Sequence, residues 1–175
     1  MKTNRRSFLK IGVAGALTLA VGGAIYRQLN PPAPPHPFML DGDASKVLAA
    51  VIPAMLASAL PSEPMARAAA VTAATVRVRD AILGLPLATQ KEVQDLFGLL
   101  ALGPARRLLA GVSGGWDQAQ PQQVAAFLQS WRTHRIATLQ VAYLAMHDLI
   151  LGAWYADPST WAAIGYPGPL KELLA

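Results

Sequence analysis

The sequence predicts an all-α fold, a compact bundle of about five or six helices. Apolar residues recur at helical spacing from residue 38 onward, and no segment alternates as a β-strand does. Caps, glycines and prolines divide this region into segments of helical length. With 53% hydrophobic residues in 175, the chain can bury the core of one domain. We therefore expect a helical domain at residues 41–175, preceded by a leader at 1–30 and a Pro-rich spacer at 31–40.

The first expected helix spans residues 44–59, after a turn and cap at Asp41-Gly42-Asp43. Its apolar face has the spacing of a helix, with Val47, Leu48, Val51, Ile52, Met55 and Leu56. Pro53 lies inside this run. Because proline lacks the amide N–H and clashes with the preceding turn, we expect a kink or break near Val51.

Two further helices are predicted in the middle of the chain. Ser62-Glu63-Pro64 offers a cap, an acid and a first-turn proline for a helix from 63 to about 83, with Gly84 as its stop. Thr89 and Glu92 have the spacing of a capping box, which predicts a helix to about Leu102. A short helical piece at 105–110 should follow.

The longest helical region should run from Pro121 to about Tyr155, with a break near 132–135. Two apolar faces follow from its spacing. The first comprises Val124, Phe127, Leu128 and Trp131, and the second Leu139, Tyr143, Met146 and Ile150. Asp157 should cap a short helix that begins at Pro158.

Residues 1–30 have the form of an export signal. Arg5-Arg6 is followed by Phe8-Leu9-Lys10 and an uncharged segment at 11–26, which is typical of the twin-arginine route. An ordinary secretory signal is the alternative, but glycines dilute the apolar segment. The signal predicts a periplasmic protein and the twin-arginine translocase as a partner. Cleavage of the leader and its retention as an inner-membrane anchor both stay open.

The spacer contains five prolines between residues 31 and 37. Proline fixes φ and removes amide donors, so we expect an extended, semi-rigid connection. A ligand for a proline-recognising domain is the functional alternative.

The charge balance bounds the functions of the domain. The formal charge is +5, and residues 1–30 hold five basic residues and no acid, which leaves ten of each sign in the rest. A body with no net charge should have no basic face, so we expect no nucleic-acid partner. The chain has no cysteine, which excludes disulfides, cysteine-held zinc, iron–sulfur clusters and covalently attached haem.

The remaining candidates for chemistry are few. His147 and Asp148 follow Tyr143 on one predicted helix, but adjacent helical residues point about 100° apart, so we expect no orienting pair. An enzyme that uses these three residues is the weakest hypothesis. Arg77 and Asp80 should form a surface pair at i, i+3. We expect no catalytic, cofactor-binding or metal-binding residue in this chain.

The C-terminal region concentrates aromatic residues. Four of the twelve aromatics of the chain lie within thirteen residues, and prolines and a glycine follow them. The candidate partner-binding residues are Trp154, Tyr155, Trp161, Tyr166, Pro167, Gly168 and Pro169. Rigid aromatics on an irregular backbone are typical of a partner-binding surface. A plug at one end of the bundle is the alternative, and the two are compatible.

The twin-arginine leader, the Val51-Ile52-Pro53 helix and the aromatic end together resemble the gluconate 2-dehydrogenase subunit 3-like family. These proteins are small subunits of bacterial FAD-dependent sugar, polyol and alcohol dehydrogenases. The resemblance implies a large partner subunit of the glucose–methanol–choline (GMC) type that holds the FAD and oxidises the substrate. It also implies that the small subunit escorts this signal-less partner through export and supports its folding and FAD loading. A multihaem cytochrome c often completes such complexes.

The leading hypothesis is therefore a non-catalytic accessory subunit of a periplasmic flavin-dependent dehydrogenase. The alternative is a stand-alone periplasmic or membrane-associated helical protein that binds an apolar ligand, a lipid or a quinone.

Overall fold

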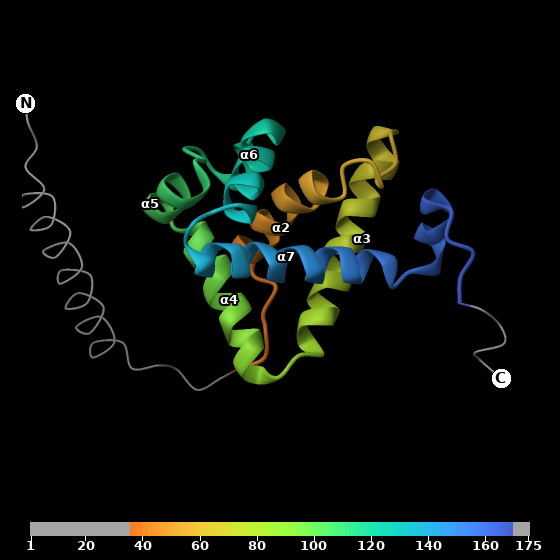
Figure 1. The fold of residues 1–175 in the computed structure, drawn as a ribbon, viewed down its shortest axis with the longest axis horizontal. Helices are drawn as coiled ribbons and strands as arrows, with labels where there is room; N and C mark the ends of the chain where they lie inside the picture. Colours follow the sequence, from red (N-terminus) through yellow and green to blue (C-terminus); the bar gives the residue numbers. More distant parts are fainter. Residues whose placement is uncertain (1–35, 170–175) are drawn as a thin grey trace, which may run out of the picture. The chain divides into compact units, whose positions relative to one another are not determined.

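A computed structural model of the chain describes residues 36–169 (Figure 1). The export-signal residues Arg5, Arg6, Phe8, Leu9 and Lys10 and the first half of the spacer, residues 31–35, lie outside the described residues, as do the last six residues of the chain. His36, in the middle of the spacer, is exposed.

The described residues form helices and no strand, as predicted. Five α-helices have 12 to 20 residues. They are α2 (Gly42–Met55), α3 (Pro64–Leu83), α4 (Leu87–Ala101), α6 (Pro121–Arg132) and α7 (Ala137–Tyr155). The short elements are α5 (Gly103–Ala105), the π-helix η1 (Arg106–Ala110) and the 3₁₀-helices η2 (Trp116–Gln118) and η3 (Pro158–Ile164).

Helix α2 lies at the centre of the fold, in contact with α3, α4, α6, α7 and η2. Its predicted apolar face is confirmed, because Val47, Leu48, Val51 and Ile52 are all buried. Removing each such side chain from water stabilises the fold by about 1.5–3 kcal/mol. Asp41 caps the helix, since its Oδ1 accepts a hydrogen bond of 2.7 Å from the amide of Ala44.

The helix does not break near Val51, where Pro53 led us to consider a break. Helix α2 continues through Pro53 and ends at Met55, earlier than the predicted Ala59. The proline lies in the last turn, so it interrupts little of the helix. It still lacks the N–H that would bond to the carbonyl of Ala49 in a regular helix.

The start of α3 confirms the predicted helix but corrects its cap. Glu63 rather than Ser62 is the capping residue, and its carboxylate accepts hydrogen bonds from the amides of Met65 (2.9 Å) and Ala66 (2.5 Å). These bonds, that from Ala66 foremost, lower the pKa of Glu63. The helix ends at Leu83, before Gly84, as expected.

The capping box predicted at Thr89 and Glu92 is wrong, because α4 begins earlier, at Leu87. Gln90 is instead buried within the first turn. Its Nε2 donates to the carbonyls of Leu83 (3.1 Å) and Leu85 (2.8 Å), and its Oε1 accepts from the amide of Phe38 (2.8 Å). The buried side-chain amide of Gln90 thus joins the segment before α2, at Phe38, to the connection between α3 and α4.

The C-terminal half follows the prediction closely. The break at 132–135 separates α6 from α7. The predicted face of α6 is buried along its length, whereas on α7 Met146 and Ile150 are buried and Leu139 and Tyr143 are half-buried. The indole of Trp131 donates to the carbonyl of Leu109 at 2.8 Å, which joins α6 to η1. No helix within residues 36–169 has the length and hydropathy needed to cross a bilayer.

Candidate partner-binding surface

The aromatic residues at the C-terminal end divide into a buried part and an exposed part. Trp154, in the last turn of α7, is 6% exposed and belongs to the hydrophobic core. The guanidinium carbon of Arg77 lies 5.8 Å from the centre of its ring, within the range of a cation–π contact. Trp154 therefore closes the end of the bundle, and Tyr155 beside it is half-buried.

Asp157 connects this end to α3. Its Oδ1 accepts a hydrogen bond from the amide of Ser159 (2.9 Å) and caps η3, and its Oδ2 pairs with Nη2 of Arg77 at 2.5 Å. The hydrogen bonds from Ser159, with a smaller contribution from Arg77, lower the pKa of Asp157. The predicted Arg77–Asp80 pair is wrong, because Asp80 pairs with Arg79 instead. Sequence spacing could not reveal a carboxylate 80 residues away.

The segment after η3 is fixed by local contacts. Nε1 of Trp161 donates to the carbonyl of Tyr155 at 2.7 Å, and the rings of Trp161 and Tyr166 meet edge to face with centroids 5.1 Å apart. Gly165 and Gly168 have φ of 68° and 97°, a region that favours glycine. A Cβ at Gly168 would lie 3.3 Å from Cζ3 of Trp161, so this glycine lets the backbone approach the ring.

The fixed segment exposes apolar surface. Ile164 is 53% and Tyr166 45% exposed, Pro167 and Pro169 are exposed, and Trp161 is half-buried. We call Trp161, Ile164 and the residues 166–169 the aromatic surface. The predicted candidates thus separate into Trp154, which is core, Tyr155, which packs against the core, and the remaining five, which lie on this surface.

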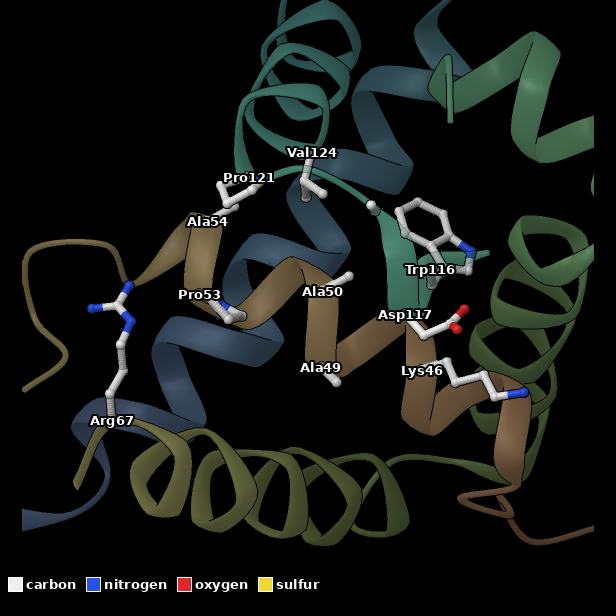
Figure 2. Close-up of a pocket in the computed structure, with 11 residues that line it drawn as sticks. Lys46, Ala49, Ala50, Pro53, Ala54, Arg67, Trp116, Asp117, Pro121 and Val124 are labelled. Atoms are coloured by element: carbon white, nitrogen blue, oxygen red, sulfur yellow. The ribbon is translucent and has the colours of Figure 1, made fainter. Parts of the chain in front are cut away.

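A groove of about 390 Å³ lies along α2, away from the aromatic surface (Figure 2). Its floor consists of small residues of α2, and Trp116, Pro121 and Val124 line its other side. Figure 2 shows Arg67 at one end and Lys46 at the other, near Asp117. The small floor residues are Ala49, Ala50, Pro53 and Ala54.

His147 contradicts one expectation. Its Nδ1 lies 3.0 Å from Oδ1 of Asp148, although the two residues are adjacent on α7. Rotation of the half-buried imidazole and the exposed carboxylate brings the two groups together despite the 100° between their Cβ directions. The ring also lies 5.8 Å from that of Tyr143, beside a recess of about 240 Å³. Within the described residues, no three His, Asp or Glu side chains gather as metal ligands would.

The charged side chains are distributed unevenly in space. Arg77, Arg79 and Lys91 pair with carboxylates. Arg106, Arg107, Arg132 and Arg135 instead lie on neighbouring elements, η1 and the end of α6 with its following loop. The prediction of no basic face outside the leader is therefore wrong here, because a neutral total conceals a local excess. The sequence contains an indication of this local excess, since Asp117 is the only acidic residue between residues 96 and 147.

A comparison of the chain with protein-family models, curated proteins and solved structures finds no match.

Proposed function

We propose that this chain is a non-catalytic small subunit of a periplasmic flavin-dependent dehydrogenase of the GMC type. In this role it escorts the signal-less catalytic subunit through twin-arginine export and supports its folding and FAD loading. The FAD belongs to the partner, and a multihaem cytochrome c subunit is the electron acceptor expected in such a complex. Leader cleavage would release the complex to the periplasm, and retention would hold it at the inner membrane.

The observation that carries the proposal is the aromatic surface. Exposed aromatic rings usually lower the solubility of a monomeric protein. Here two glycines, an indole hydrogen bond and the Asp157–Arg77 pair hold such rings in one arrangement. Ordered aromatics lose little conformational entropy on binding, which suits an interface. The proposal also rests on the twin-arginine form of residues 1–10 and on the resemblance described above.

The neighbouring reading frame provides the first test. We expect it to encode a flavoprotein with a dinucleotide-binding glycine motif and no export signal. A neighbour with its own signal, or of another class, would count against the escort role.

Co-expression provides the direct test. The large flavoprotein should reach the periplasm with bound FAD only when this chain is present. Replacing Trp161 and Tyr166 by alanine should lower the yield of periplasmic FAD-bound flavoprotein at least tenfold, which corresponds to one interface hot spot or more. Met65→Ala is the matched control, since Met65 is 81% exposed but lies at the start of α3. Equal export with and without the chain would refute the proposal.

The groove along α2 favours the alternative function, a stand-alone protein that binds an apolar ligand. Its volume of about 390 Å³ lies within the range of small-molecule sites. Purification of the exported protein as a monomer that carries lipid or quinone, with no protein partner, would support this alternative. In that case Ala50→Trp, which fills the groove floor, should abolish ligand retention and leave the aromatic surface intact.

A further inference from the structure

The end of the bundle formed by the α4–α5 junction, η1, the end of α6 and the loop before α7 combines basic and apolar groups. We call it the arginine end and define it by Arg106, Arg107, Arg132, Arg135, Leu102, Leu108 and Ile136. The indole bond from Trp131 to the carbonyl of Leu109 and the packing of α6 on η1 bring its parts together. In Figure 1 this end lies at the opposite side of the picture from the start of α3.

Its charges are not neutralised within the described part of the chain. None of the four arginines lies within ion-pair distance of a described carboxylate. Arg107, Arg132 and Arg135 are exposed, and Arg106 is half-buried with a hydrogen bond of 3.0 Å to the carbonyl of Ala101. Asp117 lines the groove along α2, where Lys46 also lies. The arginine end therefore has a local charge of about +4.

Its apolar side chains project into solvent. Leu108 is 86% exposed, the most exposed large hydrophobic residue in the described chain, and Leu102 and Ile136 are 59% and 51% exposed. Leu108 directly follows two arginines in the short π-helix η1, which ends at Ala110 and is capped by Gly111 with φ of 67°. Leu108 also lines a recess together with Phe127 and Ser130 of α6, which places it beside that helix.

From this juxtaposition we propose that the arginine end binds the surface of an anionic phospholipid bilayer. The arginines contact lipid phosphates, Leu108 enters the acyl region, and Leu102 and Ile136 add apolar contacts. Basic residues near an anionic surface and apolar residues below the headgroups act together in peripheral binding. A nucleic acid would use the charges but leave three exposed aliphatic side chains without a partner. The inference does not depend on the proposed dehydrogenase complex.

A site-specific fluorescent probe tests this in the full chain, whose basic leader can also attract lipid. The chain has no cysteine, so Leu108→Cys creates a single site for an environment-sensitive dye. Met65→Cys, at a residue 81% exposed on another part of the domain, is the matched control. With vesicles that contain phosphatidylglycerol, the dye at 108 should shift to shorter wavelength and brighten, and the dye at 65 should not. Vesicles of phosphatidylcholine alone should change neither, and added salt should reverse the response.

Charge removal completes the test. Arg107→Gln, Arg132→Gln and Arg135→Gln together, in the 108-labelled chain, should weaken the vesicle response on the order of 100-fold. Arg67→Gln, Arg79→Gln and Lys91→Gln remove the same number of charges elsewhere and should change it little. Circular dichroism checks that both triple variants keep their helical content.

Several results would overturn the inference. A chain that sediments with vesicles while neither dye responds is held by its leader alone. Equal responses at 108 and 65 would mean non-specific insertion. A response at 108 to duplex DNA or to the co-expressed flavoprotein, but not to vesicles, would assign the arginine end to that partner instead.

Discussion

Helix α7 joins two ends of the domain that treat charge in opposite ways (Figure 1). At its C-terminal end Arg77 forms an ion pair with Asp157. This pair anchors the start of the segment that carries Trp161 and Tyr166. At the arginine end the four arginines have no described carboxylate within ion-pair distance, and Leu108 is largely exposed. An internally satisfied end suits a rigid protein interface. An end with unpaired cations suits a surface that supplies the anions.

The largest expected effect is a loss of folding stability when a core tryptophan is removed, compared with the removal of a surface tryptophan. Trp131 is 1% exposed, and its loss removes ring packing on Phe127 and leaves the carbonyl of Leu109 without its donor. Trp131→Ala should lower the free energy of unfolding by about 3–5 kcal/mol. Trp161→Ala, at the aromatic surface, should cost about 1–2 kcal/mol, because its ring is half-buried. Urea denaturation of the two variants measures the difference, and equal losses would contradict this division.

Acid should loosen the aromatic end through Asp157. Its pKa is lowered in the folded protein, so its ionised form stabilises the fold. That contribution is complete above the unfolded value of about 3.8 and is lost as pH falls through the lower folded value. A pH titration of unfolding should therefore show a loss in this range that Asp157→Asn removes. A pH profile of Asp157→Asn with the same loss as the wild type would contradict this role of Asp157.

Glycine substitutions test how tightly the aromatic surface is fixed. Gly168→Ala places a Cβ 3.3 Å from the Trp161 ring at a φ of 97° and should destabilise by about 1 kcal/mol. Gly152→Ala is the control, because a Cβ there meets nothing within 4 Å. Alanine favours the helix over glycine, so this variant should raise the free energy of unfolding by about 0.5–1 kcal/mol. Thermal unfolding resolves the opposite signs. A stabilised Gly168→Ala variant would show that the ring contact is not constraining.

The smallest effect belongs to Leu108. A side chain that is 86% exposed contributes little to folding, so Leu108→Ser should change stability by less than about 0.5 kcal/mol. Denaturant titration checks this. A loss above 1 kcal/mol would mean that Leu108 has a structural partner, and its exposure would then need another explanation.

The sequence predicted what depends on local periodicity and missed what depends on tertiary contact. The apolar faces of α2, α6 and α7, the break at 132–135 and the Asp157 cap all arise from spacing within one segment. Thr89 and Glu92 had the spacing of a capping box, but burial of Gln90 favoured an earlier start of α4. The ion pair of Arg77 with Asp157 joins residues too far apart in sequence for spacing to predict.

The sequence predicted the location of the candidate site but not its composition, because the composition depends on tertiary contacts. Clustering of aromatics identified the C-terminal end, but only packing separates Trp154 from Trp161. Counting charges over the whole body hid the arginine end, since it forms when η1 and α6 meet in space. The resemblance to the dehydrogenase small subunits and the export signal stay predictions.

The distribution of indoles gives this domain a built-in optical reporter. Of the four tryptophans in the chain, three are buried in the core and Trp161 alone is half-exposed to solvent. Iodide, which cannot enter a packed interior, should quench the emission of that ring selectively. Occupancy of the neighbouring surface could then be followed by protection from quenching in unlabelled wild-type protein.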